Sequence, residues 1–249
     1  MRLESEKRTG RWTAGLVLAF LAACGGQPDG SATPESTGAP PRGATGTAAG
    51  PAEMRAGVDP ARGPRVVILG TSLTAGLGLD PDSAWPALLQ RAADSAGVRV
   101  QIVAAGLSGE TSAGALRRAD WVLSESADVV VLEVGANDGL RGVNPDTTRA
   151  TLIALVERVR AKLPEATVAL VQMEAPPNLG ADYTRSFRAV YGEAATRTGV
   201  TLLPFLLEGV AGESTLNQTD GIHPNERGSH VVAANMWRAL QPLLVMPER

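Results

Sequence analysis

The chain has 249 residues, of which 44% are hydrophobic and 20% charged, so it is long enough for one ordinary domain with terminal extensions. Its formal charge is -3 and its basic residues are scattered, so the sequence does not indicate a surface that binds nucleic acid. One cysteine, Cys24, and two histidines, His223 and His230, are too few for a zinc cluster or a disulfide framework, so no metal is expected.

Residues 1–23 have the pattern of an export signal. Basic residues before position 12 precede the apolar stretch 14–22, which is shorter than the ~20 residues that a membrane-spanning helix needs. The segment ends Leu21-Ala22-Ala23-Cys24 and resembles the lipobox of bacterial lipoproteins. The resemblance implies an exported protein, anchored to a membrane of the cell envelope by lipid on Cys24. The alternative is an ordinary secretory signal in which the cysteine is incidental.

Residues 24–63 differ in composition from the rest of the chain. They are rich in Gly, Pro, Ala, Ser and Thr and contain almost no large apolar side chain. Such a segment buries too little surface to offset the entropy of ordering it. We therefore expect a disordered tether that joins Cys24 to a folded domain at residues 64–249.

From residue 65 onward, short apolar runs alternate with helical patterns. The runs predict strands at 66–69, 98–103, 129–134, 168–171 and 200–203, and the helical patterns lie at 84–96, 112–124, 147–162, 183–198 and 226–244. Continuous runs of this length suit strands that are covered on both faces, as in a parallel sheet. The alternation predicts an α/β domain with three layers and five parallel strands. Sites in such sheets form at the carboxyl ends of the strands.

The first strand is followed by Gly70-Thr71-Ser72-Leu73-Thr74. A serine here places its hydroxyl at the carboxyl edge of the sheet, where we expect it on the surface. The hydroxyl is a weak nucleophile unless a base takes its proton. Taken alone, a serine after a glycine in a turn is more often a turn or capping residue than a nucleophile.

A candidate base lies near the other end of the chain, in Asp220-Gly221-Ile222-His223-Pro224. Asp220 lies three positions before His223, so a turn lets the carboxylate accept the Nδ1 proton while Nε2 faces the serine. His230 falls inside the next predicted helix without an acid nearby in sequence, and we interpret it as structural.

Two glycine-containing loops follow the second and third strands, at 106–111 and 135–139. Acyl transfer requires hydrogen-bond donors that point at the developing oxyanion. A glycine lets its backbone N–H approach a ligand without a side chain in the way, and the asparagine of the second loop, Asn137, offers an uncharged side-chain donor. Each loop alone is an ordinary glycine turn, but four such segments occur in order, each after its expected element.

These four segments resemble the conserved blocks of the SGNH (GDSL-type) hydrolase family, from residue 65 to about residue 244. The resemblance implies Ser72 as nucleophile, Asp220 and His223 as its acid and base, and an oxyanion hole made by Ser72, Gly109 and Asn137. It also implies a flavodoxin-like α/β/α fold and no cofactor. The family usually has Asp where Thr71 stands, so the bracing of the nucleophile loop is expected to differ.

The match is closest to the arylesterase and thioesterase/lysophospholipase branch of that family. We therefore expect hydrolysis of short-to-medium acyl esters, thioesters or lysophospholipids through an acyl-enzyme. A carbohydrate O-deacetylase is the alternative within enzymes, and a surface binding module with an idle triad is the alternative outside them. The loop from Met173 to Gly180 follows the fourth strand, and its Met173 and Leu179 could line an acyl groove or belong to a plain connection.

Overall fold

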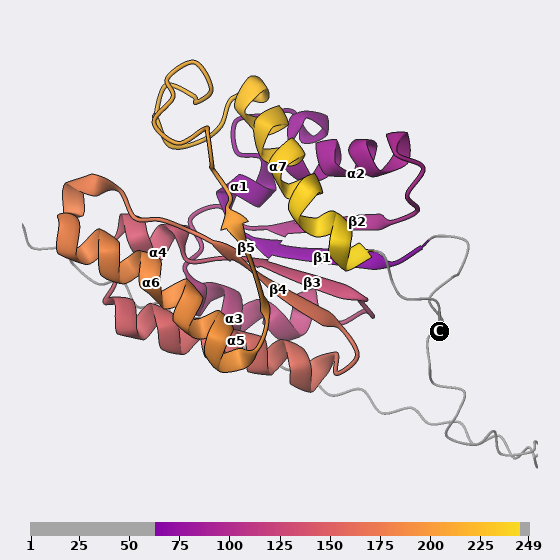
Figure 1. Cartoon of the computed structure of the whole chain (residues 1–249), viewed down its shortest axis with the longest axis horizontal. Helices are drawn as coiled ribbons and strands as arrows, with labels where there is room; N and C mark the ends of the chain where they lie inside the picture. Colours follow the sequence, from indigo (N-terminus) through magenta and orange to yellow (C-terminus); the bar gives the residue numbers. More distant parts are fainter. Residues whose placement is uncertain (1–62, 245–249) are drawn as a thin grey trace, which may run out of the picture. The chain divides into compact units, whose positions relative to one another are not determined.

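The computed structural model of the protein describes residues 63–244. The predicted signal segment, Cys24 and nearly all of the predicted tether lie outside the described residues. The described part of the chain alternates strands and helices along its length (Figure 1). The strands are β1 Arg65–Gly70, β2 Gln101–Gly106, β3 Val129–Glu133, β4 Thr167–Gln172 and β5 Thr201–Phe205.

The longer helices are α2 Trp85–Ser95, α3 Ser112–Val122, α5 Pro145–Lys162, α6 Ala181–Thr198 and α7 Glu226–Leu244. Four short helical segments lie between the longer elements: α1 Ser72–Ala75, η1 Pro81–Ser83, α4 Ala136–Leu140 and η2 Pro177–Leu179. The α/β class, the five strands and the five longer helices are confirmed. The short helices were not predicted, because a segment of three to five residues is too short to show helical periodicity.

The five strands form one parallel sheet in the order β2-β1-β3-β4-β5. Helices α2 and α7 pack together on one face of this sheet, and α3, α5 and α6 cover the other, which gives the predicted three layers (Figure 1). Because all strands run the same way, their carboxyl ends meet at a single edge. The loops that carry the candidate site residues all leave from that edge.

The core lies between the central strands and the apolar sides of the helices. Every residue of β3 is buried, as are all residues of β1 after the first. Helix α6 buries Phe187, Val190, Tyr191 and Ala194, whose spacing places them along one side of the helix. The hydroxyl of Tyr191 donates to the carbonyl of Val134 at 3.0 Å, so this core side chain also fixes the exit of β3.

The prediction that every strand is covered on both faces is wrong for the edge strands. Strand β2 has no buried residue, and β5 buries only Leu203. Each of these two strands pairs with only one other strand of the sheet. The apolar runs in the sequence do not distinguish such edge strands from central ones. Strand β2 also begins at Gln101, three residues later than predicted. Within residues 63–244, no helix has the length and apolar character needed to cross a membrane.

Candidate active site

The nucleophile loop begins where β1 ends. Thr71 caps the short helix α1, with its hydroxyl accepting from the N–H of Leu73, and Ser72 is the first residue of that helix. Gly70 cannot carry a side chain here, since a Cβ would lie 2.1 Å from the hydroxyl oxygen of Thr74. The tight packing of Gly70 therefore lets the chain turn directly from strand to helix and fixes Ser72 at the carboxyl edge.

Ser72, His223 and Asp220 come together although 151 residues separate the serine from the histidine. Nε2 of His223 lies 2.8 Å from Oγ of Ser72, and Nδ1 lies 2.7 Å from Oδ2 of Asp220. Ser72 is only 7% exposed, so the expectation of a surface hydroxyl is wrong.

The carboxylate of Asp220 sets the tautomer of the imidazole. Desolvation raises the pKa of Asp220, but hydrogen bonds from the His223 ring and from the N–H groups of Ile222 and His223 outweigh it and lower the pKa to about 2. Asp220 is therefore ionised at neutral pH and accepts the proton on Nδ1 of His223. Nε2 is then left as the acceptor for the Ser72 hydroxyl.

The loop of the histidine is tied to the loop of the nucleophile by Gln218. Its side-chain amide donates to the carbonyls of Leu77 and Pro224 at 2.7 and 2.9 Å. The N–H of Gln218 also donates to the carbonyl of His223 at 2.7 Å. No local pattern in the sequence marks this glutamine as a link between the two loops, because its partner Leu77 lies 141 residues away.

Glu133 is a second functional residue that sequence reasoning missed. Its fully buried carboxylate accepts from the N–H and the hydroxyl of both Thr71 and Thr74, at 2.7–3.3 Å. Burial raises the pKa of Glu133 to about 7, against the lowering effect of these hydrogen bonds. Thr71 thus braces the nucleophile loop through Glu133. A charged residue in an otherwise apolar strand was the available signal.

The candidate oxyanion donors lie around Ser72. Asn137 is 9% exposed and borders the same groove as Ser72 and His223, with its Nδ2 donating to the carbonyl of Glu110 at 3.0 Å. An amide nitrogen carries two protons, so one remains for a ligand. The N–H groups of Ser72 and Gly109 have no acceptor among residues 63–244. At Gly109, φ is +77°, a conformation that favours glycine.

Arg118 of α3 joins three segments of the site. Its guanidinium pairs with the carboxylate of Glu110 at 2.6–2.8 Å and donates to the carbonyls of Gly70 and Ala105 at 3.1 and 2.9 Å. Because Asn137 donates to the backbone of Glu110, the same arginine indirectly positions a candidate oxyanion donor. Its contacts connect the ends of β1 and β2 with the loop before α3.

A groove of about 440 Å³ opens beside Ser72, within the size range of ligand pockets. Its lining is mainly apolar and comes from the carboxyl end of β5 and from the segments after four strands, and it includes Leu73, Leu140, Phe205 and Leu207. Apart from His223, the only ionisable side chain that lines it is Glu174. The groove therefore suits an uncharged, apolar group attached to a carbonyl at Ser72.

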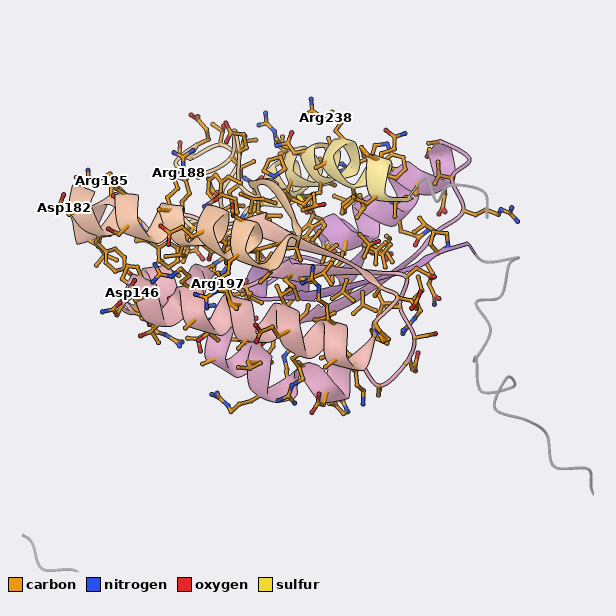
Figure 2. All side chains as sticks on the ribbon, turned by 60° about the horizontal axis from the view of Figure 1, so that its bottom comes forward. Asp146, Asp182, Arg185, Arg188, Arg197 and Arg238 are labelled. Carbon is orange, nitrogen blue, oxygen red and sulfur yellow. The ribbon has the colours of Figure 1, made fainter. Side chains whose placement is uncertain are left out.

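The loop after β4 contributes to the groove through Met173 but not through Leu179, the other residue that was expected to line an acyl groove. Met173 and Glu174 to Pro177 line it, whereas Leu179 is exposed and lies outside the lining. The carboxylate of Glu174 is 3.3 Å from Arg188, which projects outward from α6 (Figure 2). This ion pair neutralises the charge at the groove's border.

His230 lies on α7, exposed, and has no hydrogen bond to the triad. Among the described residues, no group of three or more His, Cys, Asp or Glu side chains is placed to hold a metal ion.

Comparisons with known proteins point to one family. Residues 68–231 match the profile of the GDSL-like Lipase/Acylhydrolase family. The chain is 40% identical over 180 residues to Esterase TesA of Pseudomonas aeruginosa, covering 72% of this chain and 89% of that protein. It is 38% identical over 180 residues to Thioesterase 1/protease 1/lysophospholipase L1 of Escherichia coli K12, covering 72% and 84%.

The fold is also similar to solved structures. The crystal structure of TesA superposes with a TM-score of 0.69 at 40% identity and covers 72% of this chain and 99% of that one. The psychrotrophic esterase EstA from Pseudoalteromonas sp., in a structure inhibited by monoethylphosphonate, gives a TM-score of 0.69 at 35% identity and covers 73% and 98%.

Proposed function

The chain belongs to the GDSL-like lipase/acylhydrolase family, and from that premise we propose that it is a serine ester hydrolase in which Ser72 is the nucleophile. The relatives named esterase, thioesterase/lysophospholipase and arylesterase support a carboxylic ester hydrolase. The observation that carries the assignment of roles is the chain of two short contacts from Ser72 through His223 to Asp220.

The reaction proceeds in two halves. Nε2 of His223 takes the Ser72 proton while Oγ attacks the ester carbonyl carbon, and the carbonyl oxygen becomes an oxyanion held by the N–H groups of Ser72 and Gly109 and by Asn137. The imidazolium then protonates the leaving alcohol or thiol, which departs and leaves an acyl-enzyme. Water gives a proton to the same Nε2 as it attacks the acyl carbon. The imidazolium then returns this proton to Oγ as the acyl–oxygen bond breaks, which releases the acid and restores the free serine.

The groove supports an acyl group of short to medium length. Each methylene that it takes out of water contributes up to about 0.8 kcal/mol, or about fourfold in an equilibrium constant. The ion pair with Arg188 neutralises Glu174, the acidic side chain that lines the groove. We therefore propose aryl esters, thioesters and lysophospholipids as the substrate classes, in preference to acetylated carbohydrate.

The variant Ser72→Ala tests the nucleophile. It should keep the fold but lose at least about 10⁴-fold in kcat on p-nitrophenyl butyrate, because the other triad members have nothing to activate. A fluorophosphonate probe should label the wild type and not the variant; the Pseudoalteromonas esterase is inhibited by monoethylphosphonate, a related reagent. Turnover by the variant at wild-type level, or absence of labelling in the wild type, would contradict the proposal.

A series of p-nitrophenyl esters from acetate to palmitate tests the acyl preference. We expect kcat/KM to rise from acetate towards butyrate or hexanoate as methylenes enter the groove. A maximum at acetate with a steady fall for every added carbon would favour the carbohydrate O-deacetylase.

A further inference from the structure

The exposed apolar side chains of the described residues are unevenly distributed. Seven large ones are at least 36% exposed, and five of these lie on the segments between the carboxyl end of a strand and the next long helix. Each of the five strands is followed by one of them: Leu77 after β1, Leu107 after β2, Leu140 after β3, Leu179 after β4 and Ile222 after β5. The other two, Trp121 on α3 and Leu202 within β5, lie away from these segments.

The five side chains, here called the apolar rim, all follow the carboxyl ends of the strands, the edge of the sheet at which the groove opens. Leu140 and Ile222 line the groove itself, and Leu77 borders the small cavity behind Ser72. Leu179 lies beside Gly142, where a Cβ would come within 3.9 Å of it, and Leu107 is two residues from Gly109. Short helices α1 and α4 mark this edge of the sheet (Figure 1).

The position of the rim restricts what can cover it. A protein bound over all five segments would close the groove against substrate. A lipid surface would bury the same side chains and also deliver acyl esters to the opening. The rim further carries Arg141, exposed and without a carboxylate partner among residues 63–244. A guanidinium between aliphatic side chains suits the level of lipid phosphates, where the stem is buried and the charge is hydrated.

We infer that the apolar rim docks the mouth of the groove onto a lipid surface, from which acyl-ester substrate enters. This inference rests on the proposed esterase function, and it names the form in which the substrate is presented. Gln218 donates to the carbonyl of Leu77, and Arg118 donates to the carbonyls that end β1 and β2, so hydrogen bonds hold the segments that carry Leu77 and Leu107 in place.

The test compares two double variants. Leu107→Ser with Leu179→Ser removes two rim side chains that do not line the groove, and Trp121→Ser with Leu202→Ser removes the two exposed apolar side chains outside the rim. All proteins are full-length and carry Cys24→Ala, so that lipid at that position does not contribute. Binding is measured by sedimentation with phosphatidylcholine vesicles containing one-fifth phosphatidylglycerol, and turnover is measured separately on p-nitrophenyl butyrate in solution.

We expect the rim variant to bind vesicles at least about tenfold more weakly and to hydrolyse vesicle-embedded p-nitrophenyl palmitate correspondingly more slowly, because two leucines lose their burial. Its turnover of dissolved butyrate ester should stay within about twofold of the parent, and the control variant should match the parent in every assay. Absence of vesicle binding by the parent, or equal loss in both variants, overturns the inference. So does self-association that the rim variant abolishes without any vesicle binding.

Vesicle binding is read without substrate, so the inference and the proposed function fail separately. A parent that binds vesicles but hydrolyses no ester contradicts the esterase function and supports the docking surface. A parent that hydrolyses dissolved esters but does not bind vesicles contradicts only the docking surface.

Discussion

Ser72 is buried beside His223, so the reactivity of its hydroxyl depends on that histidine. The hydroxyl has little contact with solvent, and its nearest polar partner is Nε2 at 2.8 Å. The proton of Ser72 therefore has one route, to His223. The ionised Asp220, with its pKa of about 2, holds the opposite nitrogen over the whole neutral range.

The two histidines should consequently differ in their importance for turnover. His223→Ala should lose about as much kcat as Ser72→Ala, and the double variant should lose little more, because the two side chains act as one unit. His230→Ala is the matched control and should stay within about threefold of wild type, since it has no contact with the triad. Comparable losses in both histidine variants would contradict the assignment of the base.

Glu133 should make the stability of the domain depend on pH. Its pKa of about 7 in the folded state exceeds the ordinary 4.5, so folding favours the protonated carboxyl. This contribution is fully present below about pH 4.5 and is lost as the pH rises through about 7, a change on the order of 3 kcal/mol. Glu133→Gln can keep both backbone N–H donors bonded through one oxygen, and its unfolding free energy should vary less between pH 4.5 and 7.5.

Denaturant unfolding at a series of pH values measures this difference. Asp220 does not interfere, because its lowered pKa confines its contribution to more acidic solutions. Equal slopes for wild type and Glu133→Gln would show that Glu133 titrates near its ordinary pKa.

At the level of residues, the sequence predicted the groups that belong to short motifs and missed those that act across the fold. Ser72, His223 and Asn137 stand next to glycine turns or recognisable blocks. Glu133 and Gln218 act on loops 59–62 and 141 residues away, and such contacts depend on the strand order and the folding of long loops. The contacts that brace the site therefore could not be predicted from local sequence, whereas the candidate chemical groups could.

At the level of elements, helix α3 carries Arg118, whose contacts join the ends of β1 and β2 to the loop that contains Glu110. Removing Arg118 leaves the carboxylate of Glu110, 5% exposed, without its ionic partner. Breaking a buried ion pair from one side typically destabilises a protein by about 3–5 kcal/mol. Arg118 also donates to the carbonyl of Gly70, directly before the nucleophile loop.

Arg118→Lys should separate the positioning effect from the loss of charge. A lysine retains the pairing with Glu110 but cannot also reach the carbonyls of Gly70 and Ala105 with a planar fork. We expect kcat to fall by about tenfold with KM within about twofold, because misplaced oxyanion donors weaken the transition state more than the ground state. Arg117→Ala, at the exposed neighbouring position, is the control and should leave both constants unchanged.

The strands and longer helices could be predicted because their apolar periodicity is local. Which strands lie at the edges could not, because β2 and β1 have similar apolar runs but different neighbours. Helices α1 and α4 were not predicted for a different reason, because each is only about one turn long. Helix α1 lies between the capping Thr71 and Gly76, and α4 begins directly after Gly135.

At the level of the whole molecule, the sequence predicts an anchor and a tether ahead of the hydrolase domain. Cys24 and residues 25–62 lie outside the described part of the chain, so this organisation remains a proposal. A tethered enzyme would stay near a membrane, and the apolar rim would then face a surface that is already within reach.

Mass spectrometry of the mature N-terminal peptide tests the anchor. We expect the mature chain to begin at Cys24 and to carry lipid, with two or more acyl chains, since a single chain binds a membrane only marginally. Cys24→Ala should release the enzyme from the membrane fraction while its turnover of dissolved esters persists. A mature chain that begins elsewhere, or a soluble wild type, would contradict the prediction.

The separation of 151 residues between Ser72 and His223 also affects the order in which the enzyme becomes active during synthesis. A nascent chain acquires its nucleophile early, but its base appears only after about 150 further residues have been added. The helix α7 that follows His223 must then pack on α2 before the two ends of the site are held together. Truncated translation products therefore contain an unactivated serine and should not attack cellular esters.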